Sequence, residues 1–188
     1  RLSRDWGHVQ LAGIVRRIEW DDLQADQFDL SGKETGWGLN LSSNLKLGQH
    51  VARMSLVYGE GVQNYMNDAP VDIGIRENFS DPMRPIEGTA LPLFGLVAFL
   101  DLNWSEIWTS TVGYSMLDID NSSGQSADAF SKGQYALANI LYHPTGNLFL
   151  GPEIQWAKRD NYQDGFSSDD LRVQFSVKYS FNKNFGGK

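Results

Sequence analysis

Residues 171–181, LRVQFSVKYSF, alternate between apolar and polar side chains without a break. Successive side chains of a β-strand point to opposite faces, so this segment has one continuous apolar face. Its other face carries Arg172, Lys178 and short polar residues. A strand of this kind needs an apolar environment along one whole face, and that environment is either a protein core or lipid.

The same alternation recurs along the chain and predicts an all-β protein of about eight antiparallel strands. Residues 128–143 also contain good helix formers, but Gly133 and the following turn sequence HPTGN favour a strand. Pro152 removes a ladder donor and predicts a bulge or a local break. The predicted strands cover residues 8–20, 36–47, 50–60, 89–101, 104–117, 133–143, 147–158 and 171–181.

The connections between these strands alternate strictly between short and long. Short turns follow the second, fourth and sixth strands, whereas the other links are long and polar: residues 21–35, 61–88, 118–132 and 159–170. All long loops therefore lie at one end of an up-and-down sheet, as in transmembrane β-barrels of the bacterial outer membrane. We predict that the apolar faces meet lipid and that residues 1–188 form one antiparallel up-and-down transmembrane β-barrel domain, or part of one.

Aromatic side chains cluster near the predicted strand ends, as expected for belts at the two membrane interfaces. A soluble β-sandwich would also have alternating, aromatic-rich strands and stays an alternative. The aromatic residues on the short-turn side are Trp6, Trp104, Trp108, Tyr142, Tyr179 and Phe181, and those on the long-loop side are Trp20, Trp37, Tyr58 and Trp156.

Composition excludes several functions. The chain has 16 Lys and Arg against 23 Asp and Glu, a net charge of −7, which argues against a nucleic-acid partner. It has no cysteine, so it has neither disulfides nor thiolate sites. His8, His50 and His143 lack metal-ligand spacing, and no nucleophile elbow is present. We expect no enzyme activity, no catalytic residue, no metal and no cofactor.

The more informative charges lie on the polar faces of the predicted strands. Arg16, Arg53, Arg172 and Lys178 fall on these faces, which in a barrel line the lumen. Cations there would favour small anions, so these four are the candidate substrate-binding residues, although ordinary wall charges explain them equally well. The long segment 61–88, with three prolines, either folds over the pore or reaches a neighbouring subunit.

Five stretches carry a resemblance to a known family: HVQLAGIVRRIEW, GWGLNLSSNLKLG, VARMSLVYGEGVQNYMNDAPVD, YSMLDIDNSSGQSADAFSKGQYALANILY and DGFSSDDLRVQFSVKYSF. Together they resemble the C-terminal half of the DcaP-like porins over nearly the whole chain. The resemblance implies a trimeric outer-membrane barrel of sixteen strands, without redox or metal cofactor, that passes dicarboxylates and related small anions. The chain departs from that pattern in having about eight strands and in continuing with residues 182–188 after Phe181.

The leading hypothesis is an outer-membrane porin, or its C-terminal portion, for passive diffusion of small anionic solutes such as dicarboxylates. Its expected partners are these solutes, outer-membrane lipid and lipopolysaccharide, with a homotrimer if the chain is part of a full-length porin. One alternative is a small non-conducting barrel that acts as a structural anchor or adhesin through its long loops. Another is a soluble carbohydrate-binding sandwich.

Overall fold

The computed structural model describes residues 1–66 and 69–181, and the regular secondary structure of these residues is β-strand apart from one 3₁₀ turn. A short strand, β1 (Leu2–Arg4), comes first, and the β4–β7 connection carries a 3₁₀ turn, η1 (Gln63–Tyr65), and the strands β5 (Ile73–Glu77) and β6 (Ile86–Ala90). The long strands are β2 (Gly7–Trp20), β3 (Gly32–Leu47), β4 (His50–Glu60), β7 (Pro92–Asn103), β8 (Trp108–Ile119), β9 (Phe130–Thr145), β10 (Leu148–Asn161) and β11 (Ser167–Tyr179).

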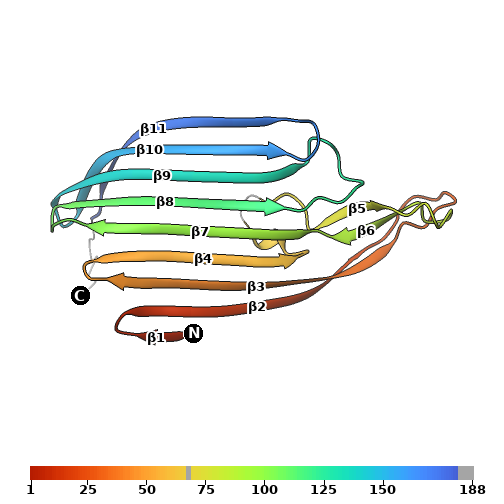
Figure 1. Cartoon of the computed structure of the whole chain (residues 1–188), viewed down its shortest axis with the longest axis horizontal. Helices are drawn as coiled ribbons and strands as arrows, with labels where there is room; N and C mark the ends of the chain where they lie inside the picture. The colour runs from red at the N-terminus through yellow and green to blue at the C-terminus, as the bar shows by residue number, and fades with distance from the viewer. Residues whose placement is uncertain (67–68, 182–188) are drawn as a thin grey trace, which may run out of the picture.

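The long strands form a single antiparallel sheet in chain order, β1-β2-β3-β4-β7-β8-β9-β10-β11 (Figure 1). Tight turns join the strands at one end, and the long connections, with the β5–β6 hairpin, lie at the other end. The predicted all-β, up-and-down topology is therefore confirmed. Among the described residues β1 and β11 are the free edges of the sheet, so closure into a barrel stays a prediction.

Three local predictions are decided by backbone pairing. The fifth predicted strand begins at Trp108 rather than Trp104, because the N–H of Trp104 donates to the Trp108 carbonyl across a tight turn, 3.0 Å. Residues 130–145 form strand β9, not a helix. Pro152 lies inside β10 opposite Phe175, and the register with β9 shifts nearby, between Leu148 and Leu150. The predicted tail, residues 182–188, lies outside the described residues.

The register places apolar side chains side by side on one face of the sheet. Leu11, Leu41, Leu56 and Leu96 pair directly across β2, β3, β4 and β7. This face is uncovered along the described chain: Val15 is 76% exposed and Val173 on β11 is 71% exposed. The apolar face of the sheet therefore has no protein partner within the described residues.

The buried core lies on the opposite, polar face. Residues 61–66 and 69–72, called the inward-folded segment below, lie over this face, and Val62 from this segment packs with Leu91, Leu93 and Ile119. The β5–β6 hairpin that follows extends beyond the long-loop end of the sheet (Figure 1). Gly38 of β3 permits the close approach, because a Cβ there would lie 3.1 Å from the Val62 side chain. The first part of the long segment therefore lies on the polar side of its own sheet, and both its predicted place over a pore and contact of the rest with a neighbouring subunit stay predictions.

Truncation of a core leucine tests this packing. We expect Leu91→Ala, at a side chain only 1% exposed, to lower the free energy of unfolding by about 2–5 kcal/mol through lost burial and a cavity. The control is Leu11→Ala on the uncovered face, where the side chain is 67% exposed and leaves no cavity. Equal losses in urea unfolding of the two variants would contradict the assignment of the core to the polar face.

Candidate functional site

A chain of hydrogen bonds crosses five strands on the polar face. Arg53 Nε on β4 donates to Asp101 Oδ2 on β7 at 2.6 Å, and the Thr111 hydroxyl on β8 donates to Asp101 Oδ1 at 3.1 Å. The Thr111 N–H donates to Asn139 Oδ1 on β9, and Asn139 Nδ2 donates to Glu153 Oε2 on β10 at 3.1 Å. This polar belt, Arg53, Asp101, Thr111, Asn139 and Glu153, holds its charged groups at fixed positions.

Glu153 is the most heavily bonded carboxylate of the belt. It accepts hydrogen bonds from the side-chain amides of Asn139, Gln155 and Gln174, the last at 2.8 Å. The register places Arg172 of β11 opposite Gln155, next to this group. The three amides and the neighbouring arginine stabilise the negative charge of Glu153, so this carboxylate is a structural part of the sheet's polar face.

Arg16, the first predicted site residue, connects the sheet to the inward-folded segment. Its guanidinium lies 2.9 Å from Asp72 Oδ2 and 5.6 Å from the centre of the Tyr65 ring. The Asp72 carboxylate also accepts the Asn64 N–H at 2.9 Å. Both charged side chains are partly buried, 23% exposed for Arg16 and 17% for Asp72. The structure therefore gives Arg16 an anchoring contact, and its contact with solute stays a prediction.

The other three predicted cations lie at separate places on the polar face. Arg53 pairs with Asp101 at 2.6 Å, whereas Lys178 lies 5.7 Å from the centre of the Phe149 ring near the short-turn end. Arg172 and Lys178 make no ion pair within the described part of the chain. The four residues do not form one cluster, and a role in solute binding stays a prediction for each.

A groove separates the inward-folded segment from the wall. It has a volume of about 720 Å³ and runs under Tyr65 and Met66, over the inner side chains of β4, β7, β8, β9 and β10. Arg159 lines it near the long-loop end. The predicted loop 159–170 begins at Arg159, but in the structure β10 extends to Asn161. Continuing the period-two pattern from Glu153 by six residues would have put Arg159 on the polar face.

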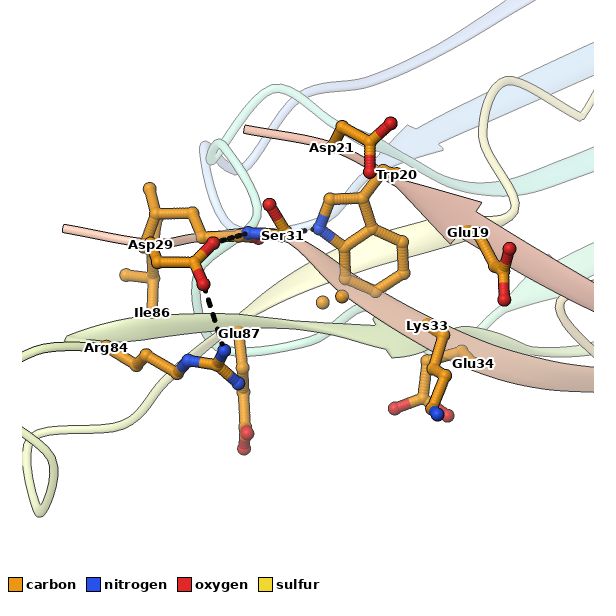
Figure 2. A pocket seen from close by; sticks show the side chains of 13 residues that line it. Glu19, Trp20, Asp21, Asp29, Ser31, Lys33, Glu34, Arg84, Ile86 and Glu87 are labelled. Carbon is orange, nitrogen blue, oxygen red and sulfur yellow. Dashed lines mark hydrogen bonds and ion pairs between the residues drawn. The ribbon is translucent and has the colours of Figure 1, made fainter. Parts of the chain in front are cut away.

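A second cleft, of about 570 Å³, lies between the β2–β3 connection and the β5–β6 hairpin (Figure 2). Trp20 Nε1 donates to the Leu30 carbonyl at 2.7 Å, and the Trp20 ring packs tightly against Gly88. Hydrogen bonds from Ser31 lower the pKa of Asp29, and Arg84 at 3.3 Å adds to this effect. These contacts brace the hairpin at the long-loop end of the sheet.

Aromatic residues line the uncovered apolar face near both ends. The rings of Trp108 and Tyr142 lie 4.8 Å apart on the short-turn side, and those of Trp37 and Tyr58 lie 5.8 Å apart on the long-loop side. The Trp37 Nε1 donates to Glu60 at 2.8 Å, with the carboxylate on the loop side of the ring. An indole that is apolar on one side and hydrogen-bonded toward water on the other suits a membrane interface.

Two features are absent from the described residues. Residues 1–66 and 69–181 contain no group of three or more His, Asp or Glu side chains arranged to hold a metal ion. Within the same residues, no helix has the length and hydrophobicity needed to cross a membrane.

The fold has a counterpart among solved structures. The crystal structure of the outer membrane channel DcaP of Acinetobacter baumannii matches with a TM-score of 0.71 and 21% sequence identity, over 94% of this chain and 47% of that chain. This chain has the fold of part of that channel. It spans about half of the channel's length. No family model and no curated protein matches the sequence.

The Arg16–Asp72 contact is testable as an anchor by a double-mutant cycle. We expect Arg16→Gln and Asp72→Asn to couple by about 1–2 kcal/mol in urea unfolding, because the pair is partly buried and joins two segments. Each single variant should also speed proteolysis within residues 61–91. The matched control is the exposed hairpin pair Arg76 and Glu87, where we expect less than about 1 kcal/mol. Equal coupling in the two cycles would contradict the anchoring role.

Proposed function

We propose that this chain forms the wall of a porin in the bacterial outer membrane, through which small anionic solutes such as dicarboxylates diffuse passively. One observation carries the proposal: the sheet has an uncovered apolar face bordered by aromatic side chains and a polar face that carries arginines and an inward-folded segment. A membrane channel wall needs both faces at once. The fold likeness to an outer membrane channel supports the same conclusion.

The dimensions of the apolar face suit an outer membrane. The exposed apolar residues of β11 run from Leu171 to Tyr179, which corresponds to roughly 27 Å along a strand. With a strand tilt of about 40°, this stretch spans roughly 20 Å, close to the apolar band of about 25 Å on outer-membrane barrels. Lipid and lipopolysaccharide are accordingly the proposed partners of this face, and a homotrimer is the proposed assembly if the chain is part of a full-length porin.

The polar face supports a preference for anions at short range. Arg53 belongs to an ion pair, while Arg172 and Lys178 lie on the wall without a carboxylate within ion-pair distance in the described chain. The net charge of −7 means that any anion preference comes from the positions of these cations rather than from the overall charge. No step requires a covalent intermediate, because diffusion through a water-filled lumen needs only a favourable local potential.

The reversal potential in a planar bilayer under a salt gradient tests this proposal. We expect the refolded protein to conduct with anion preference, and Arg53→Ala with Arg172→Ala to reduce that preference. A charge about 8 Å from the ion path in water contributes about 0.5 kcal/mol, so each change should lower the anion permeability and raise the cation permeability roughly twofold each, and the ratio should fall about fivefold. The matched control is Arg76→Ala on the outer hairpin, which should leave the ratio unchanged.

Unchanged selectivity in the double variant would overturn the assigned role of the two arginines. A protein that is folded and inserted in the membrane but never conducts would instead favour the anchor or adhesin alternative.

A charge on the proposed lipid face provides an independent test of localisation. Val173→Arg should make folding into lipid vesicles less favourable by about 2 kcal/mol or more, because it puts an arginine into hydrocarbon. Ser176→Arg, on the polar face of the same strand, should cost much less. If both variants fold equally well into vesicles, the apolar face does not meet lipid.

A further inference from the structure

The groove between the inward-folded segment and the wall has a chemical character that differs from the polar belt. Most of its lining is apolar: Val57 and Val97 come from β4 and β7, Leu117 from β8, and Met66 from the segment above. Val97 is an apolar side chain on the polar face, and it is 38% exposed. An apolar surface of this kind inside a channel binds apolar groups by removing them from water.

Arg159 is the charged side chain on the polar face that lines this groove. Its guanidinium lies 5.8 Å from the centre of the Phe130 ring, donates from Nε to Asn161 Oδ1 at 3.0 Å, and lies 3.5 Å from the Asp128 carbonyl. Within the described residues it makes no ion pair with a carboxylate. A guanidinium has five N–H donors, so donors are left for an incoming carboxylate.

The other cations of the polar face are engaged differently. Arg16 and Arg53 each lie against a carboxylate, at 2.9 and 2.6 Å, so an anion must compete with a built-in partner there. The lowered pKa of Asp164 comes first from the Asn161 amide and only to a lesser degree from Arg159. Arg172 and Lys178 also make no ion pair in the described chain, but they do not line the groove. Arg159 is therefore the cation of the polar face at which an apolar surface and free donors coincide.

We infer that this groove is a subsite for anions with a single carboxylate and an apolar body, with the carboxylate on Arg159 and the body against Val57, Val97 and Leu117. The inference rests on the proposed porin function, and within small anionic solutes it assigns this one groove a preference that differs from the dicarboxylates proposed for the channel as a whole. Away from Arg159 the polar groups of the groove, those of Ser55, Ser115, Gln134 and Tyr135, are neutral, so a second carboxylate at the far end of the ligand would lose hydration without a cation as partner. The subsite thus favours monocarboxylates over dicarboxylates of the same length.

Hexanoate and adipate are a matched pair of probes, because they have the same chain length and differ in the second carboxylate. We expect saturation-transfer NMR with the refolded full chain in lipid nanodiscs, corrected for empty nanodiscs, to give roughly tenfold tighter binding of hexanoate. Hexylammonium, which has the same body and the opposite charge, should bind weakest. Adipate binding as tightly as hexanoate would overturn the inference.

Variants of the groove identify the residues involved. Arg159→Gln should weaken hexanoate binding roughly tenfold, the loss expected for a charge-assisted hydrogen bond. Val97→Thr keeps the side-chain shape, adds a hydroxyl and should weaken hexanoate binding but not adipate binding. Arg76→Gln, outside the groove, serves as the control and should bind like the parent. If Arg159→Gln does not fold, Arg159→Lys and Val97→Thr decide the question, and parental hexanoate binding in both would overturn the inference.

The two proposals can fail separately. A protein that conducts with anion preference but binds adipate more tightly than hexanoate contradicts the subsite and leaves the porin function standing. Specific hexanoate binding by a folded protein that never conducts contradicts the porin function and retains the subsite.

Discussion

The antiparallel backbone ladder is the constraint on which the rest of this structure depends. Except along the outer edges of β2 and β11, each long strand exchanges hydrogen bonds with two neighbours in a nearly unbroken register, so its N–H and C=O groups are satisfied within the sheet. Only a sheet with such a ladder can expose a wide apolar face to hydrocarbon. The period of two then assigns every side chain to one of two environments, and the apolar rows and the polar belt follow from that assignment.

In β7, the most hydrophobic strand, apolar and polar residues do not alternate, and the inward-folded segment explains why. In β7 the side chains of Leu96 and Ala98 lie on the uncovered face, while Leu93 packs against Val62 and Leu91 on the other face. Both faces of this strand are therefore apolar, for different reasons. Arg16 and Asp72 hold the segment against the wall from the neighbouring part of the sheet. Between this segment and the polar face lies a groove with a mostly apolar lining, so the proposed lumen has both polar and apolar surfaces.

Charges on the polar face act locally and mostly in pairs. Arg53 lies against Asp101, Glu153 is held by amides beside Arg172, and Arg159 has only neutral acceptors within hydrogen-bond distance. In a protein with an excess of acidic residues, such an arrangement lets individual positions attract anions without a positive overall field. Arg172 is also without an ion pair in the described chain, so the proposed binding groove differs from the rest of the polar face in combining such an arginine, Arg159, with an apolar lining.

The sequence by itself determined the eight long strands to within a few residues, their order and the two faces, because a period of two and the alternating loop lengths are local properties of the chain. The strands β1, β5 and β6 were not predicted. The sequence also placed Arg16, Arg53, Arg172 and Lys178 on one face, which the register agrees with. Only the tertiary structure decided that Arg16 contacts Asp72, fifty-six residues away, and that Arg159 lines a groove. Pair formation and grooves depend on how a long loop folds back onto a sheet, and alternation within a strand contains no information about that.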